Sequence, residues 1–468
     1  MISLSSFSQI AFQKTYGSSG YETASRIIQI EDTGYVVVGS SGLTGISSDV
    51  YLLKVDSLGN YLWSKYYGGT NMEQGTDIVQ TPDSGFAICG YTNSYGSGGY
   101  DFYLIKTSEN GTVEWEKTYG GSDWDMAYGI ELMPDSGFVL IGETYSYGDG
   151  LNDIFVVRTD KMGNTLWERT YGTSQNDIGK DLVLTSNNEL IIVGNTNGRG
   201  NGLFDIYAAR LLLSNGDTLW TKTYGDSLDD FASRIRPIYI YYNIIGTTFN
   251  SFYGGSDIYI VGINDVGDTM YTQYQGTQVD DSGTDFDVRP PVDMFISGDV
   301  FVNLHGYNNY VAYFTNYFGV FLSGFTFGSV QEEHCASVCY TMDDGLILAG
   351  HTIGNALGAQ DIYLVKIGPE PTFNISSTLD DQFMDFTSIR DYTETGLTIF
   401  PNPCSDYINI EWPSHQHFSV KIFDIYGRQV KEYYNLNVLD ISDLSPSVYL
   451  MVINANNKSV KSKIIVNR

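Results

Sequence analysis

Two sets of loop residues in this sequence carry side chains suited to chemistry. The first set is carboxylates that stand close together, Asp123 near Asp125 and Asp229 beside Asp230. Two carboxyl groups flanking a glycosidic bond can act as general acid and as base or nucleophile. These residues therefore allow a secreted hydrolase, for example one that degrades glycans.

Other enzyme signatures are missing from the sequence. It contains no Gly-x-Ser-x-Gly elbow, no zinc-protease helix and no signature of a catalytic cysteine–histidine pair. Its 11 arginines form no evident cluster for a substrate carboxylate. The sequence therefore favours a protein that is not an enzyme, and the hydrolase remains the alternative.

The second set consists of aromatic and arginine side chains in loops rich in Tyr, Ser, Gly and Asn. Such loops resemble antibody paratopes, which combine rigid aromatic area with adaptable hydrogen bonding. We predict that the ligand contacts of a glycan- or protein-binding adhesion module are Tyr95, Trp124, Tyr145, Tyr147 and Arg199. The simpler alternative is that these loops only reverse the chain and were copied together with the strands around them.

A third feature is an Asp or Asn that recurs every 52 residues, at Asp49, Asp101, Asp153, Asp205, Asp257, Asn309 and Asp361. These side chains could form a ring that holds cations, but Asp more often accepts hydrogen bonds from the backbone of its own loop. Ca²⁺ is the one cofactor that the acidic loops leave open, although none has the order of an EF-hand. His334 beside Cys335 lacks zinc-site spacing, so we predict no metal there.

The recurring Asp opens a short strand in a repeat of 52 residues. A strand with Trp follows, as in 63–68, and then two strands joined by a tight turn, as in 78–80 and 86–90. In the turn, Pro82 presets φ, Asp83 binds the backbone and Gly85 tolerates a positive φ. Four short strands in a repeat of this length predict one blade of an all-β propeller. We name the strands A to D, with the Asp-led strand as C and the Trp strand as D.

The ends of the repeat region predict a closed ring. Residues 11–17 read as a D strand with no blade before them, and the last repeat stops after its C strand, 361–367. The orphan D strand would complete the last blade and remove two open edges. We therefore expect a seven-bladed β-propeller over residues 11–367, with residues 1–10 as a frayed leader or the remnant of a signal peptide.

The charge of the chain restricts its partners. The net charge is −30, and residues 397–468 carry 7 Lys and Arg against 6 Asp and Glu, so residues 1–396 hold −31. No basic stripe could neutralise phosphates, so nucleic acid is excluded as a partner. No apolar stretch is long enough to cross a membrane.

Residues 368–396 break the repeat and predict a linker, because they combine Pro, Asn and Ser with an acidic run. Residues 397–468 then read as short strands separated by turns. Their number and spacing suit a small β-sandwich. We expect two domains, the propeller and this tail.

The tail contains ordered motif residues: Pro401, Asn402 and Pro403 near its start, Asp424, Gly427 and Arg428 in its central hairpin, and Tyr449 in a later strand. With these residues the tail resembles the type A sorting domain of the type IX secretion system of Bacteroidota-type bacteria. The resemblance implies a signal peptide, passage through the periplasm, and contact of residues 397–468 with the secretion machinery. It also implies that the protein is released or anchored at the cell surface.

Overall fold

A computed structural model of the chain describes residues 10–368 and 398–466. Short segments within these ranges lie outside the described residues: 19, 44–46, 239–240, 250–254, 290–292, 303–305, 316–319, 328–331, 354–358, 401–405, 412–417, 424–428, 435, 445–446 and 456–457. Strands and no helices are found in the described part of the chain. The chain divides into two compact units, Met1–Met384 and Asp385–Arg468, and each is considered by itself.

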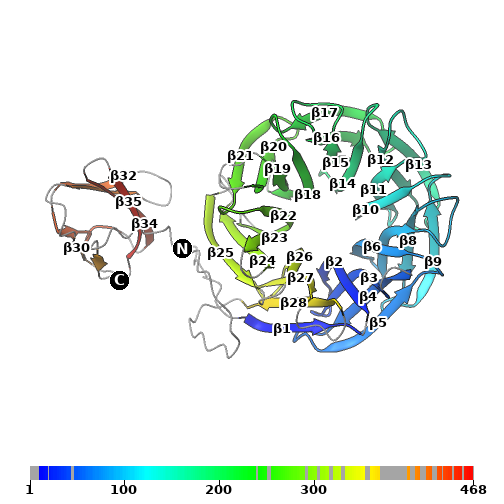
Figure 1. Cartoon of the computed structure of the whole chain (residues 1–468), viewed down its shortest axis with the longest axis horizontal. Coiled ribbons are helices and arrows are strands. Elements are labelled where there is room, and N and C mark those ends of the chain that lie inside the picture. Colours follow the sequence, from blue (N-terminus) through cyan, green and yellow to red (C-terminus); the bar gives the residue numbers. More distant parts are fainter. Residues whose placement is uncertain are drawn as a thin grey trace. The chain divides into compact units, whose positions relative to one another are not determined.

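The first unit is a ring of antiparallel sheets, which we call blades (Figure 1). The described residues form seven sheets of four strands. Blade 1 consists of β2 (Tyr21–Gln29), β3 (Tyr35–Leu43), β4 (Ser47–Val55) and β5 (Tyr61–Tyr67). Blade 2 consists of β6 (Glu73–Gln80), β7 (Phe86–Thr92), β8 (Asp101–Thr107) and β9 (Val113–Tyr119). Blade 3 consists of β10 (Asp125–Leu132), β11 (Phe138–Thr144), β12 (Asp153–Thr159) and β13 (Thr165–Tyr171).

The same order continues around the ring, so the predicted all-β propeller is confirmed. Blade 4 consists of β14 (Asp177–Leu184), β15 (Glu189–Thr196), β16 (Asp205–Leu212) and β17 (Thr218–Tyr224). Blade 5 consists of β18 (Asp230–Ile238), β19 (Tyr241–Thr248), β20 (Asp257–Ile263) and β21 (Thr269–Gln275). Blade 6 consists of β22 (Asp281–Arg289), β23 (Asp293–Val302), β24 (Gly306–Thr315) and β25 (Val320–Phe327).

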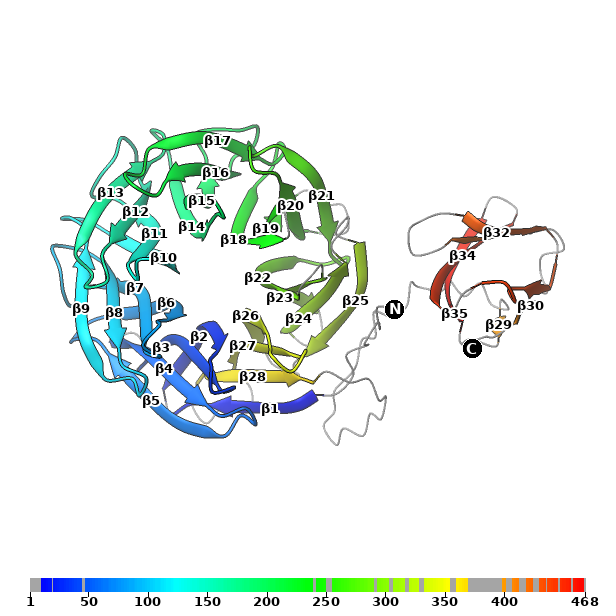
Figure 2. The ribbon, with the colours of Figure 1, turned by 180° about the vertical axis from the view of Figure 1, so that it is seen from behind.

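Blade 7 joins the two ends of the propeller. It contains β26 (Glu333–Tyr340), β27 (Leu346–Thr352), β28 (Asp361–Ile367) and the first strand of the chain, β1 (Ile10–Tyr16). Strand β1 runs antiparallel to β28, with Phe12 opposite Lys366 and Tyr16 opposite Ile362. Both views show these two strands side by side (Figures 1 and 2). The pairing gives β28 a hydrogen-bonded neighbour on each side, so β1 stabilises the last strand of the propeller.

The tight turn between the A and B strands differs from its prediction in one detail. The positive φ lies at Ser84, with a value of 62°, and not at Gly85. Gly85 is needed for another reason, because a Cβ there would lie 2.1 Å from the carbonyl oxygen of Thr107. The carboxylate of Asp83 accepts hydrogen bonds from the Thr81 hydroxyl at 2.5 Å and the Gly85 amide at 3.1 Å, as the turn chemistry predicts.

The hydrophobic core lies between neighbouring blades. Val38 and Leu52 of blade 1 share a buried cluster with Phe86 of blade 2. The recurring tryptophan packs against the same interface, since the rings of Trp63 and Phe86 are 6.5 Å apart. Burial of these side chains on both faces of each sheet explains why the B and C strands contain continuous runs of apolar residues.

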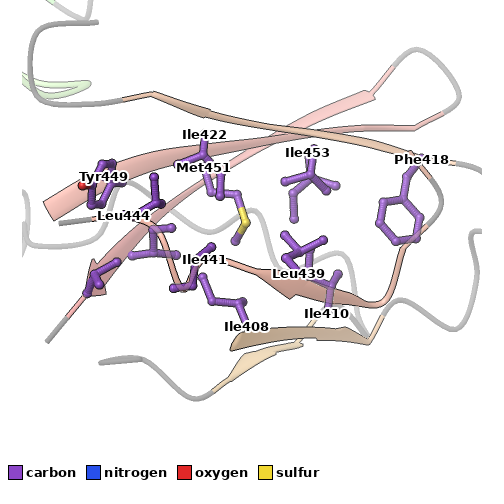
Figure 3. Close-up of a cluster of buried hydrophobic side chains, with 13 residues drawn as sticks. Ile408, Ile410, Phe418, Ile422, Leu439, Ile441, Leu444, Tyr449, Met451 and Ile453 are labelled. Carbon is purple, nitrogen blue, oxygen red and sulfur yellow. The ribbon is translucent and has the colours of Figure 1, made fainter. Parts of the chain in front are cut away.

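The second unit consists of two packed sheets. One contains β29 (Thr398–Phe400), β30 (Tyr407–Glu411) and β33 (Val438–Asp440), and the other contains β31 (Ser419–Phe423), β32 (Gln429–Tyr434), β34 (Ser447–Ala455) and β35 (Lys458–Val466). Their inner faces share a core in which Ile408 and Leu439 of one sheet meet Ile422 and Met451 of the other (Figure 3). Two layers around one apolar core are a small β-sandwich.

Among the described residues, no helix is long and apolar enough to cross a membrane.

Candidate functional site

The propeller has two unlike faces, because strand direction alternates within each blade. One face carries the D–A loops, such as 68–72, and the B–C loops, such as 93–100; we call it the loop face. The other carries the tight A–B and C–D turns, and we call it the turn face. All five predicted ligand contacts lie on the loop face.

Three of these predicted contacts form repeated hydrogen bonds within the protein. Each side chain reaches from a B–C loop to the carbonyl oxygen of a glycine in the preceding D–A loop: Tyr95 to Gly68 at 2.8 Å, Tyr147 to Gly120 at 2.8 Å and Arg199 to Gly172 at 3.2 Å. Each also lies against a ring of its own C strand, namely Tyr103, Phe155 and Tyr207. These residues fasten one loop to the next, and a ligand would meet only the exposed parts of their side chains.

The other two predicted contacts, Trp124 and Tyr145, belong to a chain of rings that we call the aromatic cluster. Tyr91 meets Tyr100 edge to face at 5.2 Å, Tyr100 meets Trp124 at 5.7 Å, and Trp124 meets Tyr145 at 6.4 Å. Edge-to-face packing holds each ring in a fixed orientation. Trp124 is 51% exposed, so a ligand can reach an indole that its neighbours have already ordered.

A buried polar group lies close to the aromatic cluster. The Glu143 carboxylate accepts a hydrogen bond from the Tyr128 hydroxyl at 2.5 Å and another from the Asn152 amide. The Lys180 ammonium lies 4.4 Å from the centre of the Tyr128 ring. Burial raises the pKa of Tyr128 and lowers that of Lys180, and the negative charge of Glu143 adds to the first shift and opposes the second.

A second group of rings occupies the loop face two blades further on. Phe204 packs against Phe231 at 5.3 Å, and Phe231 meets Phe249 edge to face at 6.1 Å. Phe204 is the repeat equivalent of Tyr100, since the two residues are 104 positions, or two periods, apart. The position between them is Asn152 and the next one is Ser256, so the aromatic side chain is not present in every blade.

The recurring Asp of the C strands caps its own B–C loop, as expected from turn chemistry. Asp101 accepts from the Ser97 amide at 2.8 Å, Asp153 from the Asp149 amide at 2.9 Å, and Asp205 from the amides of Asn201 and Gly202 at 3.0 and 2.9 Å. The structural interpretation is confirmed at these three positions. The alternative, a cation ring, is not needed to explain them.

Each of these capping carboxylates has an acidic neighbour from the next blade. A Cβ placed on Gly120 would lie 2.5 Å from both Asp101 and Asp125, which shows how closely the two carboxylates enclose this glycine. Burial raises the pKa of Asp101, and the charge of Asp125 adds to the shift. At the boundary of blades 5 and 6, burial and the charges of Asp257 and Asp280 raise the pKa of Asp281 to about 6.

The carboxylates proposed for hydrolysis mostly serve the loops. Asp125 accepts hydrogen bonds from the Gly121 amide at 2.7 Å and the Ser146 hydroxyl at 2.8 Å. Asp230 accepts from the Asp226 amide at 2.8 Å, and Asp229 accepts from the Phe204 amide at 2.9 Å. Of the four, only Asp123 is exposed, and its carboxylate accepts a hydrogen bond from the adjacent Trp124 amide at 3.0 Å.

The structure brings together three arginines that the sequence did not predict to be neighbours. We call this group the axial network; it contains Arg26, Arg234, Arg236, Asp77, Asp181 and Asp285, all on innermost strands (Figure 1). Arg234 lies 3.3 Å from Asp77, 3.7 Å from Asp181 and 3.6 Å from Asp285. Arg26 contacts Asp77 and Asp285, and Arg236 lies 2.8 Å from Asp181.

A signal for the axial network was present in the repeat. Asp77, Asp181 and Asp285 are each 104 residues apart, which is twice the period, and Arg26 and Arg234 are 208 apart, which is four periods. Each carboxylate also accepts an amide hydrogen bond from the A strand of the next blade, as Asp181 does from Ile235 at 2.9 Å. The network therefore ties strands together across the axis.

His334 is paired with a carboxylate and lies beside a second imidazole. Its Nδ1 lies 3.1 Å from the Asp299 carboxylate, which raises its pKa, and its ring is 5.0 Å from that of His351. Burial, followed by the charge of His334, lowers the pKa of His351 to about 4. Within the described ranges, no three His, Cys, Asp or Glu side chains are grouped as metal ligands. Calcium binding stays a prediction.

In the tail, Tyr449 is 7% exposed and belongs to the core of the sandwich. The other predicted motif residues lie outside the described residues: Pro401, Asn402, Pro403, Asp424, Gly427 and Arg428.

Comparison with known families identifies the tail. Residues 398–467 match the model of a secretion system C-terminal sorting domain. The tail is thus a type IX sorting domain, and the protein is secreted or attached to the outer surface. Such a domain implies contact with the secretion machinery.

Similarities over the rest of the chain are weak. PorZ, a surface component of the type IX secretion system of Porphyromonas gingivalis, has a TM-score of 0.43 at 14% identity, covering 98% of this chain and 61% of PorZ. Drosophila Plexin A in complex with Semaphorin 1b gives a TM-score of 0.49 at 9% identity, covering 78% of this chain and 88% of that one.

A curated relative, the regulatory protein FlaEY of Caulobacter vibrioides, is 23% identical over 197 residues, which is 36% of this chain. The aligned region spans about a fifth of FlaEY. None of these similarities carries an argument about function.

Proposed function

We propose that this exported protein is a non-enzymatic binding module that engages an extracellular glycan or protein through the loop face of a closed seven-bladed propeller. The aromatic cluster carries the proposal. Its rings are oriented by edge-to-face contacts before any ligand arrives, and the Trp124 indole is half exposed. Ordered aromatic side chains bind at a low cost in conformational entropy.

The same geometry supports binding over hydrolysis. Asp125, Asp229 and Asp230 accept hydrogen bonds that shape the loops, and the side chains of Asp125 and Asp230 are buried. A general acid or base must reach a substrate atom within hydrogen-bond distance. Hydrolysis by these carboxylates would therefore require the loops to rearrange.

A glycan array combined with a broad hydrolase screen on the purified full chain tests the proposal. We expect binding without turnover, weakened about tenfold or more by Trp124→Ala, because a central exposed aromatic anchor contributes at least about 1.4 kcal/mol. Met162→Ala is the matched control, since Met162 is 52% exposed on the turn face. Turnover that disappears in Asp125→Asn would overturn the proposal in favour of the hydrolase.

A further inference from the structure

The loop face exposes aliphatic side chains beside its rings. Leu151 and Leu203 occupy equivalent positions in successive B–C loops and are 59% and 68% exposed. Other exposed apolar residues of this face are Met72, Leu228, Phe249 and Ile353. A leucine has neither a polar atom for a sugar hydroxyl nor a flat ring on which a sugar can stack.

These side chains belong to neighbouring loops that touch across the blade boundaries. A Cβ on Gly202 would lie 2.1 Å from the carbonyl oxygen of Leu228, and one on Gly99 would lie 2.1 Å from the Trp124 ring. Each B–C loop therefore lies against the D–A loop of the next blade. Apolar side chains are therefore exposed on loops that touch one another, and exposed apolar surface often marks protein–protein interfaces.

The loop face is also strongly acidic. Between its strand ends the sequence places six carboxylates, Asp123, Asp149, Asp226, Asp229, Asp280 and Glu332, against one basic residue, Arg199, a net of −5. The Arg199 guanidinium is engaged by the Gly172 carbonyl and by the Tyr207 ring.

The turn face is acidic as well, but there cations from the C strands pair with some of the turn carboxylates. Lys106 lies 2.9 Å from Asp83, Arg158 lies 2.6 Å from Asp135, and Lys366 lies 3.0 Å from Asp343. No ion pair is found for Asp123, Asp149 or Asp280 of the loop face within the described part of the chain.

We propose that the partner of the loop face is a protein whose docking surface is basic and partly apolar. This inference rests on the proposed binding function and narrows its ligand to one class. The leucines and Trp124 supply the desolvated centre of the interface, and the carboxylates attract the basic partner over a Debye length. The charge pattern sets the association rate and makes the affinity fall as salt rises.

A phage-displayed library of random peptides, selected on the full-length chain at low salt, tests the partner class. We expect the enriched peptides to carry a net positive charge together with Leu or aromatic residues. Their affinity should fall about tenfold or more in a Leu151→Ser, Leu203→Ser double variant. A double variant with Asp123→Asn and Asp149→Asn should show a weaker dependence on salt.

The control for the apolar surface is Met162→Ser on the turn face, which should leave the affinity unchanged. All these side chains are exposed, so thermal unfolding should coincide with that of the parent chain. Enriched peptides without positive charge, or with an affinity that survives the double leucine variant, would overturn the inference.

Two further outcomes separate the inference from the function on which it rests. A glycan that binds through Trp124 but ignores the leucine variant would leave the binding function standing and refute the protein partner. If neither peptides nor glycans depend on the loop face, the function and the inference fail together.

Discussion

The hydroxyl of Tyr147 donates a hydrogen bond to the carbonyl oxygen of Gly120 at 2.8 Å, joining two loops that belong to neighbouring blades. The same bond recurs one period earlier between Tyr95 and Gly68, and one period later with Arg199 as the donor. The same hydrogen bond therefore forms with two types of donor, while the acceptor is a glycine carbonyl each time.

Removal of this bond should destabilise the loop face modestly. Tyr147→Phe keeps the ring against Phe155 but leaves the Gly120 carbonyl without its donor, so we expect a loss of about 1 kcal/mol in the free energy of unfolding. Tyr145→Phe is the control, because the Tyr145 hydroxyl has no hydrogen bond of this kind. Urea unfolding of both variants measures the difference, and equal stabilities would contradict the fastening role.

A substitution in the axial network should lower the free energy of unfolding far more than the loss of a surface ion pair. Arg234→Ala removes the cation that faces three buried carboxylates, so we expect a loss of about 3–5 kcal/mol. Arg169→Ala, on an exposed position of β13, should change stability by less than about 0.5 kcal/mol. Chemical denaturation of the two variants compares them directly. Similar small losses would show that the network contributes little.

The raised pKa of Asp281 predicts in which direction the free energy of unfolding changes with pH. Its pKa is about 6 in the folded protein and 3.8 as the ordinary value, so the folded state binds the proton more tightly. The contribution of Asp281 to the free energy of unfolding should therefore rise, by at most about 3 kcal/mol, as pH falls from 7 to 4.

Comparison with Asp281→Asn isolates this contribution, because every other titrating group is shared and cancels. The difference in unfolding free energy between the parent chain and the variant should shift in favour of the parent as pH falls. Urea unfolding at a series of pH values measures it. A difference that does not change with pH would show that the Asp281 pKa is ordinary.

Strand β1 should be required for a stable ring. A chain without residues 10–16 leaves β28 with an open edge and removes the contact of Phe12 with Tyr35. We expect a lower unfolding midpoint and a tendency to associate, measured by thermal unfolding and light scattering. A chain without residues 2–9 is the control and should behave as the parent. Equal stability of both deletions would contradict the closing role of β1.

The tail should direct export independently of the propeller. Residues 397–468 form a unit with its own core, so we expect them, behind a signal peptide, to carry an unrelated carrier across the outer membrane of a type IX-competent host. The carrier should appear outside the cell or on its surface. Retention in the periplasm would contradict the prediction, and the same carrier without the tail is the control.

The sequence by itself determined the parts of this protein that depend on local chemistry and on repetition. The short strands, turn residues such as Asp83 and the 52-residue period can all be recognised from the local sequence, and they predict a propeller made of four-stranded units. The tail was recognised because its motif residues follow one another along the chain. Capping by Asp101 was predictable for the same reason, since its partner Ser97 is four residues away.

Only the tertiary structure decided which side chains meet across blades. Arg26 and Asp285 contact each other although 259 residues separate them, because closure of the ring brings their strands to a common axis. The hydrogen bonds of Tyr95, Tyr147 and Arg199 could not be predicted for the same reason, since each glycine partner directly follows the last strand of the preceding blade. A period in the sequence shows that positions are equivalent, but the contacts between them depend on how the blades pack around the ring.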